Sequence, residues 1–313
     1  MVLLYIPPVQ NLLRREVTAY ASKATGMQIQ VERIDLRFPL NLLVRGVEVI
    51  QQPDTLLSLE SLNVRVQAWP LLKGKVEVDE VTLSQVAVNS ANLIEGMQIK
   101  GVLGRFFLQS HGVDLSNETA VVNRTELSDT HIQLLMTDTT TTPKDTTASA
   151  PVNWKVNLHQ LKLKNVSFGM KLPADSMKMA AYIGEATIDD AKADLKNQFY
   201  GLKQFLLSGA SASYDTGEVQ PSEGFDASHM AVRNIRIGLD SLLYEGRNMN
   251  AVIREITMEE RSGLSITSLT GRLFSNDSII RIPELKLQTP HSEIDLSAQT
   301  YCCLLYTSDA ADE

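Results

Sequence analysis

The sequence repeats one short unit in which apolar residues follow the order apolar, any, apolar, any, any, apolar, any, apolar. Copies of the unit lie at 29–36, 57–64, 76–88, 161–168 and 280–287. Alternate side chains of a β-strand share a face, so each half of the unit has one apolar face. The extra residue in the middle either forms a bulge, which bends the strand and keeps the apolar residues together, or it reverses the face. The repetition favours bulges, and a sheet that bends regularly in one sense curls into a trough or a barrel.

Composition narrows the classes of function. The chain has 313 residues, and 43% of them are hydrophobic, which is ample material for a core. The net charge is −8, and no run of Lys or Arg forms a patch for phosphates, so we do not expect a nucleic-acid partner. The two cysteines, Cys302 and Cys303, are adjacent, so a disulfide framework is excluded, and their absence elsewhere mildly favours the periplasm or exterior.

Both ends of the chain have unusual sequences. Five apolar residues precede Pro7 and Pro8, as they would where a membrane helix leaves the bilayer; these are Val2, Leu3, Leu4, Tyr5 and Ile6. A spanning helix needs about 20 apolar residues, so this stretch is either a short hydrophobic terminus or the remnant of an inner-membrane anchor. The last residues are similar to translated sequencing adapter, and we exclude them from the fold as a non-native tail.

One amphipathic helix and many strands are expected. Apolar residues from Val9 to Ala24 follow helical spacing, Pro8 suits the first turn and Gly26 suits a C-terminal cap. Trp69 to Leu72 and Leu195 to Leu207 could hold short helical turns. In the second half we predict strands near 154–172, 178–194, 207–214, 229–239, 250–258, 264–274 and 279–287.

The domain organisation follows from these elements. Residues 137–153 are rich in Thr, Asp, Ser and Pro, have almost nothing to bury and are expected to form a flexible linker. We divide the chain into an anchor remnant (1–8), an amphipathic helix (9–26), a first β-groove segment (27–136), the linker (137–153), a second β-groove segment (154–300) and the non-native tail (301–313). The fold class is mainly β, an elongated curled sheet preceded by one helix.

Histidines give no sign of a metal or catalytic site. The five of them are scattered and have no spacing that aims two ligands at one metal; they are His111, His131, His159, His229 and His291. We expect them at the surface or at strand edges.

The acidic pairs and the glycines also give no catalytic signature. Asp189 with Asp190, and Glu259 with Glu260, are consecutive, so their side chains point to opposite faces of a strand. We expect solvated charges there rather than a catalytic pair. Phosphate-binding glycine motifs and a nucleophile elbow are missing. The sequence therefore predicts a protein that is not an enzyme and needs no cofactor.

The apolar residues of the repeated strand unit form a stripe, which is the remaining candidate for a functional surface. With one helix to cover the sheet, the stripe is either an ordinary core or a wall that holds lipid. Acyl chains suit such a wall, because each buried methylene contributes roughly 0.8 kcal/mol without any specific contact. The candidate lining residues are Ile29, Val31, Ile34, Leu36, Leu57, Leu59, Leu62, Val64, Val76, Val78, Val81, Leu83, Val86 and Val88.

The sequence resembles the TamB branch of the AsmA-like envelope proteins. The likeness begins with Tyr5-Ile-Pro-Pro-Val-Gln and with the run from Ala24 to Leu40, and it continues at Leu42-Leu-Val-Arg-Gly-Val-Glu-Val. Further matches are Leu71-Leu-Lys-Gly-Lys-Val-Glu-Val and Leu269-Thr-Gly-Arg-Leu. The resemblance extends over most of residues 5 to 296.

This resemblance implies a function and a location. The resemblance implies a long, taco-shaped β-sheet (a β-taco) that is anchored in the inner membrane and extends as a bridge through the periplasm. The apolar groove of such proteins is proposed to carry phospholipids to the outer membrane, and a role in outer-membrane protein assembly with a barrel partner is also associated with them. Here most of the anchor is absent, and so is the C-terminal region that would contact the barrel protein.

Two other classes of protein stay open. A secreted adhesion or carbohydrate-binding β-protein would need exposed aromatic residues, yet aromatics make up 6% of the chain, and Trp69 and Trp154 are far apart in sequence. A β-helical polysaccharide-degrading enzyme would need clustered acids on one strand face, and the sequence shows none.

Overall fold

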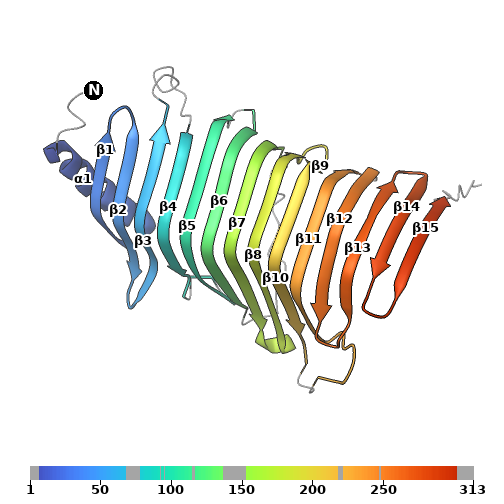
Figure 1. Ribbon diagram of the computed structural model, residues 1–313. Coiled ribbons are helices and arrows are strands. Elements are labelled where there is room, and N and C mark those ends of the chain that lie inside the picture. Colours follow the sequence, from blue (N-terminus) through green and yellow to red (C-terminus); the bar gives the residue numbers. More distant parts are fainter. Residues whose placement is uncertain are drawn as a thin grey trace, which may run out of the picture.

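The computed structural model contains one curled β-sheet and one N-terminal helix (Figure 1). It describes residues 7–67, 78–91, 93–94, 96–114, 117–136, 153–217, 221–246 and 248–301. The helix is α1 (Pro7–Thr25). The strands are β1 (Gln28–Arg37), β2 (Asn41–Gln51), β3 (Asp54–Val66), β4 (Val78–Asn89), β5 (Met97–Asp114), β6 (Thr119–Met136), β7 (Lys155–Leu172), β8 (Met177–Asp194), β9 (Phe199–Leu202), β10 (Gln204–Asp215), β11 (His229–Glu245), β12 (Asn248–Glu260), β13 (Ser265–Ser275), β14 (Ile279–Gln288) and β15 (Glu293–Tyr301). The mainly β, curled architecture predicted from the strand repeat is confirmed.

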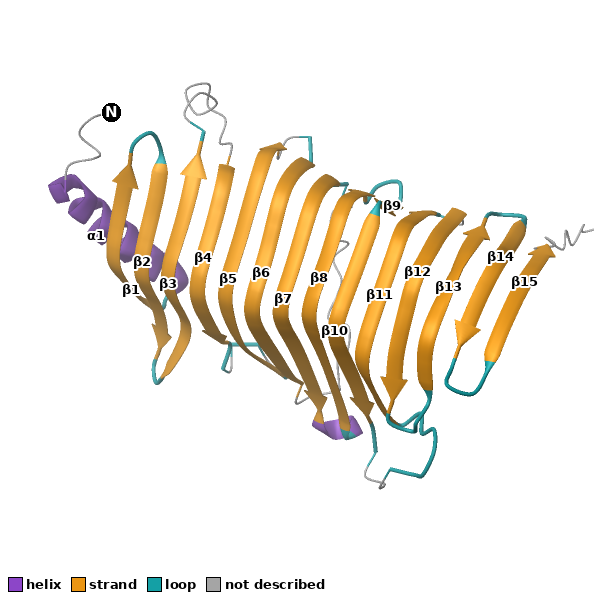
Figure 2. Cartoon of the chain, in the orientation of Figure 1, coloured by secondary structure: helices purple, strands orange, loops and turns teal. Residues whose placement is uncertain are grey.

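Helix α1 lies at the β1 end of the sheet (Figure 2). It begins at a proline, whose missing N–H would have no partner in the first turn, and Gly26 follows it with a φ of 70°. The Gly26 N–H donates to Ser22 O at 3.0 Å and closes the last turn. Arg14 Nη1 donates to Glu32 O at 2.5 Å, and Ile29 N–H donates to Ser22 Oγ at 3.1 Å, so the helix is attached to the outer edge of β1.

The strands follow the order of the chain across a single 15-stranded sheet. Neighbouring strands are antiparallel except for β6 and β7, which are parallel. Short β9 pairs with β8 and β11 and is separated from β10 by Lys203 alone, so β9 and β10 together occupy one strand position. The two predicted β-groove segments are therefore parts of one continuous sheet.

A crease crosses the sheet at the extra residue of the repeat. In each of the ladders from β1 to β8, the pairs on both sides of that residue stay in register, and the two extra residues are skipped opposite one another. Between β8 and β10 the register is also kept, but two residues of each strand are skipped. We call the extra residues the crease row: Glu32, Gly46, Glu60, Gln85, Gly104, Asp129, Asn165, Gly184 and Gly209. Five of them, Gly46, Gln85, Asp129, Asn165 and Gly209, have φ between 49° and 62°.

The crease differs from the bulges that the sequence predicts. A bulge sets two residues against one and shifts the register, whereas most of these ladders carry one extra residue in both partners and keep their register. The physical reason is the alignment of the repeat: every strand reaches its extra residue at the same level, so no strand has to absorb a mismatch. Register shifts do occur elsewhere, as between Gln109 and Ser110.

The structure corrects two element assignments. The predicted helical turns between Leu195 and Leu207 are wrong, because a turn at 195–198 leads into β9 and β10. The Asp194 carboxylate accepts the backbone and side-chain N–H groups of Asn197 at 3.2 and 2.8 Å, which favours a tight turn over a helix. The sequence reading also missed β15, whose alternation is weak but which pairs with β14 along its length.

Several sequence predictions lie outside the described residues. They are the anchor remnant Val2 to Ile6, the turn at Trp69 to Leu72, all but the last residue of the linker 137–153, and most of the tail.

Candidate functional site

An uninterrupted row of apolar side chains crosses the sheet from β1 to β15. In directly opposed pairs both side chains lie on the same face, and the pairs continue from each strand to the next. We call it the central row: Ile34, Val44, Leu62, Leu83, Phe106, Leu127, Leu163, Ala186, Leu207, Ile237, Ile256, Leu269, Leu287 and Ile294. Every member is apolar, including both neighbours of the parallel pair.

A second row runs beside the central row on the same side of the crease. It is Leu36, Leu42, Val64, Val81, Leu108, Thr125, Leu161, Ile188, Phe205, Leu239, Ile253, Gly271, Leu285 and Leu296. Only Thr125 and Gly271 are not large apolar residues, so the two rows form a band of apolar surface along the sheet.

The predicted lining residues come together in four such rows. Ile34, Leu62 and Leu83 belong to the central row, and Leu36, Val64 and Val81 belong to the second row. Across the crease, Val31, Leu59 and Val86 form a third row with Val47, and Ile29, Leu57 and Val88 form a fourth row with Val49. Val78 at the start of β4 pairs with Val66 at the end of β3, and Val76 lies outside the described residues.

Exposure differs between the two faces along the crease. Thr130, which continues the third row on β6, is 2% exposed, and Ala186 in the central row is 4% exposed, although the sheet is a single layer. On the crease row, Glu60, Gln85 and Asp129 are exposed. Side chains crowd together inside a bend and separate outside it, so we infer that each strand bends toward its apolar face.

No second layer covers this face among the described residues. The main contacts of each strand are with its neighbours in the sheet, and those of α1 are with β1. The chain exposes 20898 Å², whereas about 13,000 Å² is expected for a compact monomer of 34.6 kDa. The fourth row continues from Val88 through Gly101 to Ile132 and Phe168. Val88, Ile132 and Phe168 are 37, 39 and 40% exposed. The sheet therefore presents large apolar side chains without a protein layer against them.

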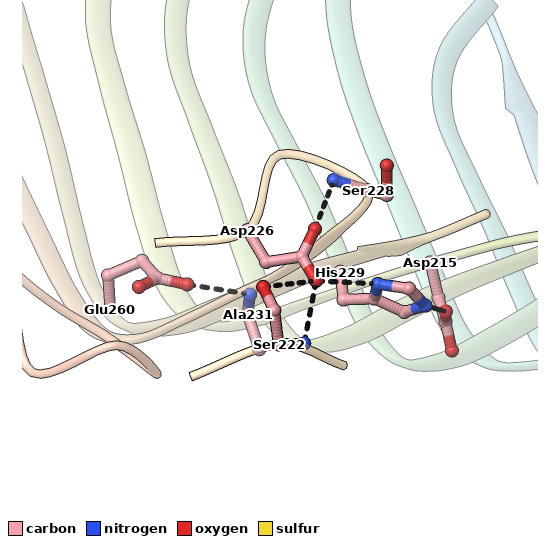
Figure 3. A network of polar contacts seen from close by, with 7 residues as sticks. All are labelled: Asp215, Ser222, Asp226, Ser228, His229, Ala231 and Glu260. Atoms are coloured by element: carbon pink, nitrogen blue, oxygen red, sulfur yellow. Dashed lines mark hydrogen bonds and ion pairs between the residues drawn. The ribbon is translucent and has the colours of Figure 1, made fainter. Parts of the chain in front are cut away.

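A polar network organises the loop before β11 (Figure 3). The Asp226 carboxylate accepts the backbone N–H groups of Ser222 at 3.1 Å and Ser228 at 2.9 Å, and lies 3.0 Å from His229 Nδ1. These backbone donors and the His229 contact hold the pKa of Asp226 well below its usual range. His229 Nε2 lies 3.3 Å from Asp215 Oδ1, and the His229 side chain is only 7% exposed. Both ring nitrogens face carboxylates, so neither is open to a substrate.

Glu260 closes the turn beside this loop. Its Oε1 accepts Ala231 N–H at 3.3 Å and its Oε2 accepts Ser262 N–H at 2.6 Å. Hydrogen bonds from the side chain and backbone of Ser262 lower the pKa of Glu260. The residue is only 8% exposed, so the expectation of a solvated charge is wrong at this position. The side chain of its neighbour Glu259 is 43% exposed and pairs with Arg233 at 3.0 Å, so the two acids do face apart.

A second group of polar contacts lies near the opposite rim of the sheet, where β7 begins and β8 ends. His159 Nδ1 is 3.1 Å from Asp190 Oδ1, and Lys203 Nζ is 3.7 Å from Asp190 Oδ2. The hydrogen bond with His159 lowers the pKa of Asp190. Asp190 has a φ of 50°, and the His159–Asp190 pair is skipped in the ladder. These contacts are exposed and stabilise a local kink.

Two further histidines, His111 and His131, also have local partners. His111 Nδ1 lies 3.3 Å from Asn123 Nδ2, and His131 Nδ1 lies 2.6 Å from Ser167 Oγ. Within the described residues, no three His, Cys, Asp or Glu side chains gather as metal ligands.

Among the described residues, the structure has no helix that is both long and apolar enough to cross a membrane. No protein-family model matches the chain, and no curated protein shows significant sequence similarity to it.

Proposed function

We propose that this chain is part of a non-enzymatic envelope protein of the AsmA/TamB type, and that its apolar face conducts phospholipids between the inner and outer membranes. The observation that carries the proposal is the central row, which stays apolar through every strand position from Ile34 to Ile294. An ordinary core of this size would be covered by a second layer. A lipid groove instead needs the same surface left accessible to acyl chains.

The length of the row favours a path over a pocket. Fourteen strand positions are separated by thirteen spacings of about 4.8 Å, so the row extends for about 62 Å. The hydrocarbon core of a whole bilayer is about 30 Å thick, so one acyl chain spans only part of the row. Contacts with an acyl chain are non-directional and similar from strand to strand, and a lipid can therefore move along the face without a specific site holding it.

The location in the envelope rests on the sequence resemblance. In this proposal the chain lies in the periplasm, tethered to the inner membrane through its N-terminal region. A contact with an outer-membrane barrel protein, and a part in assembling outer-membrane proteins, would belong to a region that follows the described residues.

Photo-crosslinking tests the proposal at neighbouring positions on one strand. A benzoylphenylalanine at Leu163 lies on the central row, whereas one at Lys164 lies on the opposite face. After expression in a bacterium with two membranes, we expect phospholipid adducts at Leu163 and not at Lys164. Equal adducts at both positions, or none at Leu163, would contradict a lipid-holding face.

A charge on the apolar face tests conduction itself. Val81 lies in the second row and is half-buried. A carboxylate there is costly to desolvate, by several kcal/mol unless water enters, so Val81→Asp should abolish lipid adducts at Leu163 while the thermal unfolding midpoint changes little. Thr82→Asp on the same strand is the control and should leave the adducts intact. A Val81→Asp protein that fails to fold would assign Val81 to a tight core instead.

A further inference from the structure

A hollow of about 620 Å³ lies at the lower rim of the sheet in Figure 1, where β6, β7 and β10 end and β5, β8 and β11 begin. Four basic side chains contribute to its lining: Lys100, Lys171, Lys178 and Arg261. They come from four separate segments, so no run of basic residues marks the hollow in the sequence. The register of the sheet alone brings them together.

Two of these lysines face each other directly. Lys171 and Lys178 are opposed partners in the antiparallel ladder of β7 and β8, which places their Cβ atoms about 5 Å apart. Like charges in this arrangement repel and destabilise the pair. Within the described residues neither lysine forms an ion pair, and both are exposed. An anion bound between the two ammonium groups would relieve this repulsion.

The nearest acid in the row is engaged elsewhere. Asp215 is the ladder partner of Lys178 on the β10 side, but its Oδ1 lies 3.3 Å from His229 Nε2. His229 also lines the hollow and holds Asp226 through its other ring nitrogen. The Asp215 carboxylate is therefore shared between Lys178 and His229, and Lys171 has no acid as a ladder partner.

We propose that this hollow binds a phosphate-bearing anion between Lys171 and Lys178, with Lys100 and Arg261 at its margin. Ammonium groups act as point charges for phosphate, and a guanidinium adds a planar pair of donors. Met170, Met179 and Met230 alternate with the polar lining residues along their strands, so their side chains lie on the other face of the sheet. A phospholipid headgroup and a free phosphate share the chemistry that the lysines recognise. The site goes beyond the proposed lipid path and does not require it.

Binding to the intact chain tests the site with a matched control. The double variant Lys171→Gln, Lys178→Gln removes the opposed pair. The control Lys164→Gln, Lys192→Gln removes two exposed lysines from the same two strands, away from the hollow. Inorganic phosphate is titrated at constant ionic strength against chloride, and flotation is measured with phosphatidylcholine vesicles with and without phosphatidic acid. Thermal unfolding without ligand verifies that both variants fold.

The site is supported if the Lys171, Lys178 variant loses about tenfold or more in affinity while the control does not, since one charge-assisted hydrogen bond accounts for about tenfold. Loss confined to vesicles identifies a headgroup, and loss confined to inorganic phosphate identifies a soluble ligand. Equal loss in both variants, or none in either, overturns the proposal. The lipid-path proposal is tested separately, because adducts at Leu163 are independent of either result.

Discussion

Gln85 occupies a backbone conformation that suits glycine or asparagine better than a long side chain. Its φ is 49°, in the left-handed region that L residues enter at a cost of roughly 1–2 kcal/mol. Gly46, Asp129 and Asn165 adopt the same conformation on other strands, and these are the residue types that tolerate it. The crease therefore depends on a few positions whose residue types are chosen for the backbone rather than for packing.

Substitutions at Gln85 test this reading. We expect Gln85→Val to lower the free energy of unfolding by about 1–2 kcal/mol, because a β-branched residue is strained at positive φ. Gln85→Gly should be neutral or slightly stabilising at the same position. Urea unfolding monitored by circular dichroism measures both. Equal effects of the two substitutions would show that the crease does not constrain this backbone.

Asp226 gives the loop before β11 a pH dependence. Hydrogen bonds from Ser222 and Ser228 lower the pKa of Asp226 in the folded state. The contribution of the ionised carboxylate to the stability of the folded loop is therefore fully present above the ordinary carboxylate pKa of about 4, and it is lost as the pH falls toward the lowered value. The protection of the Ser222 and Ser228 amides against hydrogen exchange, measured relative to their intrinsic exchange rates, should therefore fall in strong acid in the wild type. Asp226→Asn should lower this protection already at pH 6, with little further loss at lower pH. A variant as protected as the wild type at pH 6 would contradict this role.

At the scale of the elements, the strands approach one another closely at the crease. A Cβ added to Gly104 would lie 2.7 Å from Asp129 Cβ and 3.0 Å from Asp129 O, whereas one added to Gly169 would meet only Gln133 Cγ at 3.9 Å. The contacts at Gly104 include the backbone carbonyl oxygen of Asp129, which cannot move without its strand. An alanine at Gly104 would therefore force the two strands apart.

This difference predicts opposite outcomes for the same substitution. Gly104→Ala should lower the free energy of unfolding by about 1–3 kcal/mol, as overpacking does. Gly169→Ala, near the end of β7, should be neutral or stabilising because alanine restricts the unfolded chain. Denaturant unfolding of both variants gives the comparison. A Gly104→Ala protein as stable as Gly169→Ala would show that the crease is wider than described.

The sequence predicts most of these elements, but it does not predict those that are determined only by pairing with neighbouring strands. Period-two runs such as 154–172 and 178–194 appear as β7 and β8 within a residue or so, because each strand carries its own alternation. β9 is too short to show a pattern and exists through its partners in β8 and β11. The central row was partly predictable, since Ile34, Leu62 and Leu83 stand in the repeat. Members such as Phe106 and Ala186 were not, because only the order of the strands identifies them.

The dependence on strand pairing also explains why the basic hollow at the rim was not predicted from the sequence. Lys171 and Lys178 are separated by a turn, and neither spacing nor composition shows that they oppose each other across a ladder. The buried Glu260 was missed for a related reason: its partners are backbone N–H groups of Ala231 and Ser262, and these have no signature in a sequence.

At the scale of the whole molecule, a single-layer sheet buries less surface than a compact protein. The unfolded chain would expose about 50,000 Å² at this mass, so folding to 20898 Å² removes about four-fifths of the area that a compact fold would remove. The slope of unfolding free energy against urea concentration scales with that area. We expect a slope about one-fifth below that of a compact monomer of equal length. A slope equal to the compact value would indicate that another layer covers the sheet in solution.

The shared level of the crease makes the sheet modular. At one rim of the sheet β2 and β4 end, and β3 and β5 begin. Removing the hairpin β3–β4 would therefore bring β2 against β5 in the same antiparallel arrangement. Val44 would then lie opposite Phe106, and the creases of the two strands would be aligned. Such a chain changes its reach in steps of one hairpin, about 9.6 Å, without altering its cross-section. Gene segments encoding hairpins could thus be gained or lost as interchangeable units, and the distance that the protein covers could be adjusted independently of how each strand folds.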